Sequence, residues 1–365
     1  MKVIHIALHV TVALLLALAF DCYNTRSHHS SLQDMFSALS TRLLSLATVR
    51  TLSKHAPSTS FDHSKDIRHI QPSSSLSSST TTSSSTMSDK LPVYFISHAG
   101  PNQAVDESVT ADFFAELGKK WTSLSDPTPA SILVISGHWE GDQGIIRVRT
   151  SEENKLYYDF YNFPDFMYKL QYPSKGSPKL ANRVLQLLSE ANIPAEAETK
   201  RGIDHGVWVP LLRILPKPEI PIVQMSLADM RDQPTEKTFE YHYKLGQALT
   251  KLREENVLIV ASGTAVHNLR DLGTYMRSGT KVAPYVAPFD ALLDKVALSE
   301  SESERRVAAI NEMAQSKYLR SAHPSLDHLL PFHVALGAAG EDKAKILHKN
   351  FFLSLSESAY SFGEK

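Results

Sequence analysis

From about residue 91 onward, short apolar runs alternate with longer amphipathic segments. The apolar runs are rich in Val and Ile and mostly lack strict alternation, which is typical of strands covered on both faces. Strands are expected at residues 93–97, 132–136, 145–149, 220–226 and 257–261, and helices at 109–121, 178–191, 235–255 and 289–298. This alternation predicts an α/β fold: a single globular domain with a central, mostly parallel or mixed sheet, flanked by helices, with its active site at the carboxyl ends of the strands.

The N-terminal part of the chain has a different pattern. Residues 3–20 are nearly all apolar, follow Lys2 and contain Ala17-Leu18-Ala19, a small-x-small pattern like that of a signal-peptidase site. Residues 1–22 are therefore expected to be a signal-like leader. An uncleaved membrane anchor is the alternative, although the run is at the short end of what spans a bilayer.

A serine-rich segment joins the leader to the predicted domain. Residues 73–86 are almost wholly Ser and Thr, and such a tract cannot bury enough apolar surface to offset its ordering entropy. Residues 23–90 are therefore expected to be a disordered linker, followed by a globular domain at 91–356 and a C-terminal tail at 357–365. Met87 stands just before the domain. Translation from Met87 would give a cytoplasmic protein, whereas the leader would direct the chain to the secretory pathway or an organelle.

Composition narrows the chemistry. The chain has 365 residues, 42% of them hydrophobic, and a formal net charge of −1, which gives no reason to expect nucleic acid or an anionic membrane as a partner. A single cysteine, Cys22, excludes an internal disulfide and a thiolate metal site. A metal would need histidine and carboxylate ligands, which favours Fe²⁺ or Zn²⁺. The glycine-rich nucleotide motifs and the Gly-x-Ser-x-Gly elbow of hydrolases are missing.

Three histidines follow predicted strands. His98 ends Tyr-Phe-Ile-Ser-His, His138 ends Leu-Val-Ile-Ser-Gly-His, and His267 comes after Leu-Ile-Val-Ala-Ser-Gly. A single histidine there could simply cap a strand. Two strands that each deliver a histidine to the same sheet edge are better explained by a shared metal ion. His267 is expected to be either a further ligand or a base beside the bound substrate.

Two more histidines begin helix-like segments. His205 follows Asp204, which favours a histidine able to donate a proton, although a loop histidine paired with a local carboxylate fits equally well. His328, in Leu-Asp-His-Leu-Leu-Pro, opens an apolar helical stretch, and the alternative there is a helix-start histidine that faces solvent.

The order of five motifs resembles a known family. The motifs are Tyr-Phe-Ile-Ser-His98-Ala-Gly-Pro, Ser-Gly-His138-Trp, Asp-His205-Gly-Val-Trp, Ala-Ser-Gly-Thr-Ala-Val-His267-Asn-Leu and His323-Pro-Ser-Leu-Asp-His328-Leu-Leu-Pro. Together they resemble the class III extradiol ring-cleavage dioxygenases, in the 4,5-DOPA dioxygenase-like branch, over about residues 91–356.

The resemblance implies the chemistry of the site. It implies one non-haem metal ion, Fe²⁺ for turnover or Zn²⁺ as bound, and a small aromatic diol and O₂ as substrates. His98, His138 and His328 match metal positions. His267 matches a histidine that is either a fourth ligand or the catalytic base, and His205 matches the acid/base histidine.

Two departures from the family pattern bear on this interpretation. Ala99 stands where glycine is common, which is expected to be tolerated unless the residue needs a positive φ. His328 stands where the wider superfamily often has a carboxylate, which makes the ligand set more zinc-like. A zinc-dependent hydrolase on the same scaffold, or a non-catalytic binding protein that kept the fold, are the alternative functions.

Overall fold

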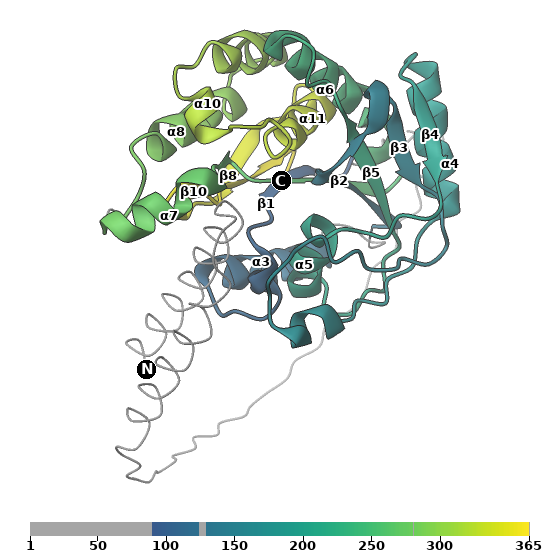
Figure 1. Cartoon of the computed structure of the whole chain (residues 1–365). Coiled ribbons are helices and arrows are strands. Elements are labelled where there is room, and N and C mark those ends of the chain that lie inside the picture. Colours follow the sequence, from purple (N-terminus) through teal and green to yellow (C-terminus); the bar gives the residue numbers. More distant parts are fainter. Residues whose placement is uncertain (1–89, 124–128, 280, 365) are drawn as a thin grey trace, which may run out of the picture. The chain divides into compact units, whose positions relative to one another are not determined.

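The structure, a computed structural model, describes residues 90–123, 129–279 and 281–364 (Figure 1). Its strands are β1 (Val93–Ser97), β2 (Ser131–Gly141), β3 (Ile146–Arg149), β4 (Ala195–Glu198), β5 (Ile222–Ala228), β6 (Val257–Gly263), β7 (Val266–His267), β8 (Ala344–His348), β9 (Phe351–Phe352), β10 (Leu355–Ser356) and β11 (Ala359–Phe362). Its α-helices are α3 (Val109–Trp121), α4 (Pro178–Glu190), α5 (His205–Ile214), α6 (Thr235–Leu249), α7 (Leu269–Ser278), α8 (Val286–Ala297), α9 (Glu302–Val307), α10 (Leu319–Ala322) and α11 (Leu330–Ala339).

The central sheet is mixed, and the predicted fold class is confirmed. Its eight strands run in the order β4-β3-β5-β2-β6-β1-β11-β8, and a small second sheet has the order β7-β10-β9. Strands β5, β2, β6 and β1 pair in parallel, whereas β3 with β5 and β1 with β11 pair antiparallel. The parallel centre brings the carboxyl ends of β1, β2 and β6 to one edge.

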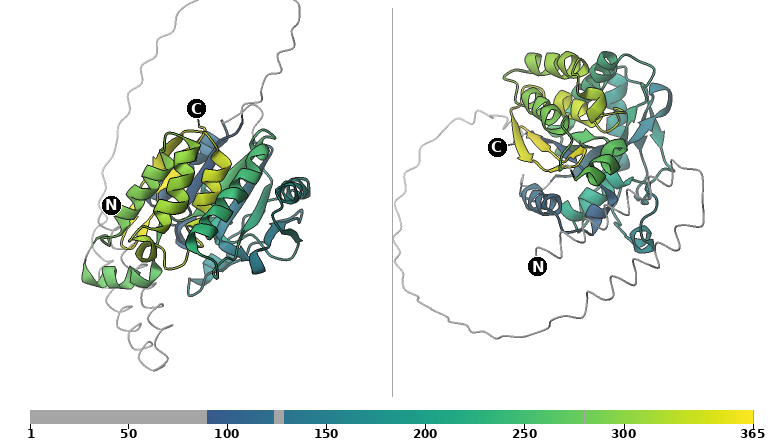
Figure 2. Two further views of the ribbon diagram at one scale, coloured as in Figure 1. Left: turned by 90° about the horizontal axis from the view of Figure 1, so that it is seen from above. Right: turned by 60° about the vertical axis from the view of Figure 1, so that its left-hand side comes forward.

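Helices cover both faces of this sheet. In β1, Val93 and Phe95 contribute to one hydrophobic cluster, while Tyr94 and Ile96 contribute to the other, because successive side chains of a strand point to opposite faces. The first cluster includes buried residues of α4, α6, α8 and α11, and the second includes those of α3 and α5. Figures 1 and 2 show the resulting layers, with α6 and α11 on one side of the strands and α3 and α5 on the other.

The predicted strands and helices are present but differ in length, and the structure adds elements that were not predicted. β2 continues past residue 136 to Gly141, so His138 lies inside the strand, where the pairing with β5 shifts register. β5 begins at Ile222 rather than at residue 220, and the helix expected to reach residue 255 ends at Leu249, followed by a 3₁₀ helix at Thr250–Arg253.

The C-terminal boundary predicted from the sequence is wrong. Residues 357–365 were expected to be a tail, but β11 lies inside the central sheet, between β1 and β8. Ala359, Tyr360 and Phe362 are completely buried. The domain therefore includes this strand.

The predicted leader (1–22) and all but the last residue of the predicted linker (23–90) lie outside the described residues. Among the helices that the structure does describe, none combines the length and the apolar character that crossing a bilayer requires.

Candidate metal centre and acid–base pair

Three of the predicted histidines converge at the carboxyl edge of the sheet. His98 follows β1 directly, His138 lies in β2, and both strands pair with β6. His328 comes from the connection between α10 and α11. This connection passes close to the strand ends because Gly263 has no side chain: a Cβ there would lie 2.2 Å from the carbonyl oxygen of His328. The strand ends and a glycine thus bring together residues far apart in sequence.

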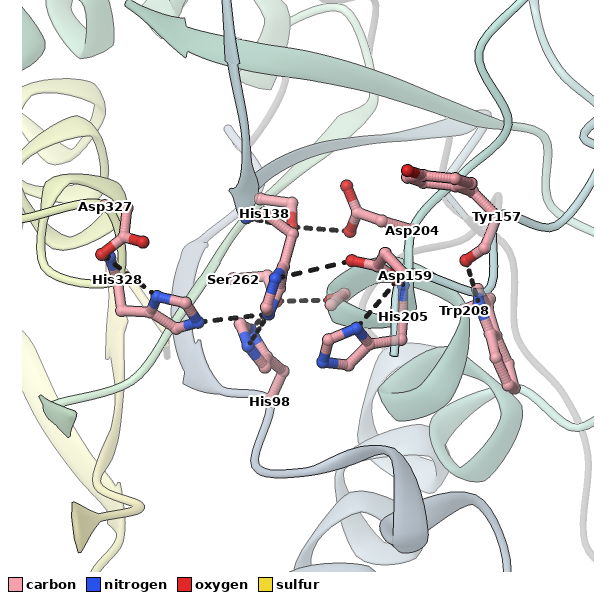
Figure 3. A network of polar contacts seen from close by, with 12 residues as sticks. His98, His138, Tyr157, Asp159, Asp204, His205, Trp208, Ser262, Asp327 and His328 are labelled. Atoms are coloured by element: carbon pink, nitrogen blue, oxygen red, sulfur yellow. Dashed lines mark hydrogen bonds and ion pairs between the residues drawn. The ribbon is translucent and has the colours of Figure 1, made fainter. Parts of the chain in front are cut away.

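The ring nitrogens of these histidines point at one another (Figure 3). Nε2 of His138 lies 3.0 Å from Nε2 of His98 and 3.1 Å from Nε2 of His328. Two nitrogen ligands about 2.1 Å from one ion lie about 3 Å apart when the angle between them is near a right angle. The three histidines could therefore hold a metal ion, and their ligand atoms all lie within 4.8 Å of one another.

The second ring nitrogen of each histidine indicates which tautomer it adopts. Nδ1 of His98 lies 3.0 Å from the Ser262 hydroxyl oxygen. That hydroxyl donates its own hydrogen to the carbonyl of Gly206, so it must accept one from His98. The remaining Nε2 of His98 then carries a lone pair.

The other two rings have carboxylates beside Nδ1. Nδ1 of His138 lies 3.5 Å from Oδ2 of Asp159, and Nδ1 of His328 lies 3.3 Å from Oδ1 of Asp327, both electrostatic contacts rather than well-aligned hydrogen bonds. Carboxylates only accept, so each contact favours a hydrogen on Nδ1 and a lone pair on Nε2. Three lone pairs that face one another repel, and a cation between them removes that repulsion. The donor set therefore fits a metal ion.

Burial favours the neutral form of three histidines at the site. Desolvation lowers the pKa of His98, His138 and His267 well below the ordinary value, and the neighbouring histidines lower it further. Burial opposes ionisation of Asp327, but its contacts with His328 hold the pKa of that carboxyl well below its usual range. Neutral imidazole is the form that binds a metal.

His205 lies beside this cluster, as its predicted role requires, but its partner is not the predicted one. Its ring centroid is 4.0 Å from that of His138. The sequence pointed to Asp204 as the neighbouring carboxylate. Instead, Nδ1 of His205 lies 2.9 Å from Oδ1 of Asp159, and Asp204 turns away to accept hydrogen bonds from Ser136, Arg201 and Gln224. Being next in sequence does not bring the Asp204 carboxylate to the imidazole.

His267 lies against the cluster rather than within it. It forms part of β7, and its ring stacks on that of His328 with centroids 3.7 Å apart and an interplanar angle of 11°. Among the described residues it belongs to neither group of side chains able to hold a metal: His98, His138 and His328 form one, and His138, Asp159 and His205 the other. This placement favours the base over the fourth ligand.

Sequence reasoning missed Asp159. It lies in Lys-Leu-Tyr-Tyr-Asp-Phe-Tyr, a segment without strand or helix periodicity, so nothing local marks its side chain as part of a site.

The backbone at Ala99 has a positive φ: its value is 57°, the left-handed conformation that glycine tolerates best. The alanine beside His98 is therefore a strained replacement, not a neutral one.

Comparison with known proteins identifies the family. Residues 87–363 match the family described as the catalytic LigB subunit of aromatic ring-opening dioxygenase. The chain belongs to the class III extradiol dioxygenases. It is 39% identical to a 4,5-DOPA dioxygenase extradiol of Beta vulgaris over 71% of this chain and 91% of that protein. A protein of the same description from Escherichia coli K12 is 29% identical over 69% of this chain and 86% of its own length.

A solved structure shares the fold. An uncharacterised protein from Escherichia coli K12 superposes with a TM-score of 0.57 and 26% identity, covering 74% of this chain and 99% of that one. The dioxygenase is therefore a ring-cleavage oxidoreductase, as its five histidine motifs predicted.

Proposed function

We propose that this dioxygenase opens the ring of a catechol with O₂, at a metal ion held by His98, His138 and His328. In the overall reaction, one ring C–C bond next to the two hydroxyl-bearing carbons breaks and both oxygen atoms of O₂ enter the product. The product is a ring-opened semialdehyde with a new carboxyl group, and the ring itself supplies the electrons. The observation that carries this proposal is the convergence of three Nε2 atoms: that of His138 lies 3.0 Å from that of His98 and 3.1 Å from that of His328.

The position of each residue indicates its task in the proposed reaction. When bound, the ion supplies positive charge that favours loss of the catechol hydroxyl protons, and a place where the two substrates meet in a fixed orientation. Nδ1 of His205 donates its hydrogen bond to Asp159, so Nε2 is the atom that exchanges a proton with the substrate. His267, stacked on His328, is the second proton acceptor beside the diol.

DOPA is the first substrate to test. Several relatives bear the name 4,5-DOPA dioxygenase extradiol, from plants and from Escherichia coli. We extend that substrate to this chain as a proposal, with simpler catechols as the next candidates. Fe²⁺ is proposed for turnover and Zn²⁺ as a tightly bound substitute, because three imidazoles suit either ion.

The test uses the full-length protein, freed of metal and reloaded under anaerobic conditions with Fe²⁺ or with Zn²⁺. DOPA and a panel of catechols are added with O₂, and O₂ uptake is followed together with the visible absorbance of the semialdehyde. We expect equimolar consumption of O₂ and catechol with Fe²⁺, abolished by His98→Ala or His138→Ala.

His348→Gln is the matched control. This histidine stacks on Phe113 and contacts Thr110, outside the cluster, so its replacement should leave turnover unchanged. If no catechol causes O₂ uptake although Zn²⁺ binds stoichiometrically, the dioxygenase proposal fails. A zinc-dependent hydrolase then becomes the better explanation of the same site.

A further inference from the structure

Asp159 links two histidines that the proposed function gives different tasks. Its Oδ1 lies 2.9 Å from both the backbone nitrogen and Nδ1 of His205, and its Oδ2 lies 3.5 Å from Nδ1 of His138. Figure 3 shows the carboxylate between the two rings, with dashed contacts to each. Its side chain is only 11% exposed, so water competes little for these contacts.

The carboxylate determines the tautomer of His205. Oδ1 of Asp159 accepts a hydrogen bond from the backbone N–H of His205 at 2.9 Å, so this oxygen acts as an acceptor. An ionised carboxylate has no hydrogen to donate, so Nδ1 of His205 must carry one. The lone pair of His205 then lies on Nε2.

The same reasoning applies to His138. Its Nδ1 faces the second oxygen of Asp159, and its Nε2 faces Nε2 of His98 at 3.0 Å. If the hydrogen moved to Nε2, His138 could not donate a lone pair to a metal. One carboxylate thus selects the useful tautomer of a proposed ligand and of a proposed acid/base group.

The segment around Asp159 is anchored by contacts of the neighbouring residues. The Tyr158 hydroxyl donates to the carbonyl of Leu170 at 2.7 Å, and the backbone nitrogen of Tyr157 donates to the carbonyl of Ile203 at 2.8 Å. The Phe160 ring packs edge-on against His205 with centroids 5.9 Å apart. Asp159 is therefore held from both sides, which is what a positioning group needs.

We propose that Asp159 is a positioning residue that keeps the Nδ1 hydrogen on both His138 and His205, leaving Nε2 of one for the metal and Nε2 of the other for proton transfer. This inference rests on the proposed function for the tasks of the two histidines. Nothing in the sequence pattern assigns Asp159 a role, since the carboxylate and the two imidazoles come from three separate segments.

Asp159→Asn is the sharpest test, because an amide has one accepting oxygen and one donating nitrogen. If its oxygen serves His205, its NH₂ faces Nδ1 of His138 and forces the hydrogen of that ring onto Nε2. Asp165→Asn is the matched control: the same change on the same segment, at an exposed side chain.

The measurements are made on full-length proteins of equal melting temperature. Zn²⁺ affinity is determined by competition with a chelator, and kcat and KM are determined with Fe²⁺ and the best catechol. We expect Asp159→Asn to weaken Zn²⁺ binding about 10-fold or more and to lower kcat about 10- to 100-fold, with KM within about 2-fold. Asp165→Asn should match the wild type. Unchanged Zn²⁺ affinity and kcat in Asp159→Asn would overturn the proposal.

A double-mutant cycle separates positioning from general loss of structure. In a His205→Gln background, Asp159→Asn should lower kcat much less than in the wild type, because part of its effect acts through His205. Its effect on Zn²⁺ affinity should persist, because that effect acts through His138. Equal fold-losses of kcat in both backgrounds would contradict a role through His205.

Two further outcomes keep the test decisive. Should the wild type turn over no catechol, the proposed function fails, while the Zn²⁺ comparison still tests the His138 half of the inference. Should Asp159→Asn not fold, Asp159→Glu replaces it. Its carboxylate is kept but displaced, so we expect a smaller loss of Zn²⁺ affinity, and an affinity equal to that of the wild type would count against the proposed positioning.

Discussion

Gly206 packs directly against the histidine cluster. It is the second residue of α5, and its carbonyl accepts the hydrogen bond from Ser262 that fixes His98. A Cβ added at Gly206 would lie 2.6 Å from the Ser136 hydroxyl, 3.1 Å from Cδ2 of His138 and 3.2 Å from Nδ1 of His98. The change Gly206→Ala therefore pushes on two proposed metal ligands at once.

Gly206→Ala has two opposing effects on stability, one from helix propensity and one from overpacking. Alanine is favoured over glycine inside a helix by about 1 kcal/mol. Overpacking typically costs about 1–3 kcal/mol, and the Ser136 hydroxyl is not free to yield, since it donates to Asp204 and accepts from the backbone of His138. We therefore expect a net loss of unfolding free energy of about 1 kcal/mol. Displaced ligands should weaken Zn²⁺ binding about 10- to 100-fold, or about 1.4–2.7 kcal/mol.

Gly273→Ala provides the comparison. Gly273 lies in α7, and a Cβ there would meet only the end of the Arg277 side chain, at 3.2 Å. This variant should gain about 1 kcal/mol of unfolding free energy from helix propensity alone and bind Zn²⁺ like the wild type. Chemical denaturation and chelator competition measure both quantities. If Gly206→Ala were as stable as Gly273→Ala and kept full Zn²⁺ affinity, the tight packing of His98 and His138 around α5 would be refuted.

Three further predictions follow from other features. Ala99→Gly should raise the unfolding free energy by up to about 1 kcal/mol, measured as a higher melting temperature. The reason is that the left-handed φ of 57° costs alanine more than the extra unfolded-state entropy costs glycine. A lower melting temperature would contradict this strain. Burial lowers the pKa of His242 to about 4. Between about pH 6.5 and 4, the unfolded chain therefore binds a proton at this histidine that the folded chain does not bind. The free energy of unfolding should fall by about 3 kcal/mol as the pH drops through this window. His242→Gln should show a smaller acid loss in denaturation curves measured at each pH, and an identical pH dependence would rule this source out. A chain ending at residue 356 should not form stable protein, because it loses the buried Tyr360 and Phe362 and the partner of β1; a cooperative melt like that of the full chain would contradict the placement of β11.

The sequence predicted the strands that deliver the first ligands because these strands are locally unmistakable. Residues 93–97 and 132–136 are short, apolar and rich in Val, Ile and other β-formers, and a parallel sheet brings such carboxyl ends to one edge. His98 and His138 could be placed together on that basis. His328 could not, because its approach depends on the space left by Gly263 at the end of another strand.

What the sequence could not predict depends on contacts between distant segments. Asp159 reaches His205 from an irregular segment, and the more obvious Asp204 is diverted by Ser136 and Gln224. β11 was mistaken for a tail because four residues, Ala-Tyr-Ser-Phe, give too short a pattern to identify a strand. The strain at Ala99 has no local signal at all, since it is set by the turn that follows β1.

The neighbours of β1 also constrain when the enzyme can first exist during its synthesis. Val93 pairs with Ile259 on one side and with Phe362 on the other. The first strand of the domain therefore cannot complete its pairing until β11 has been synthesised. Contacts of such long sequence separation form late and slowly. We therefore expect β1 to reach its final place in the sheet only after Phe362 has been synthesised, well after the segments that carry His98 and His138.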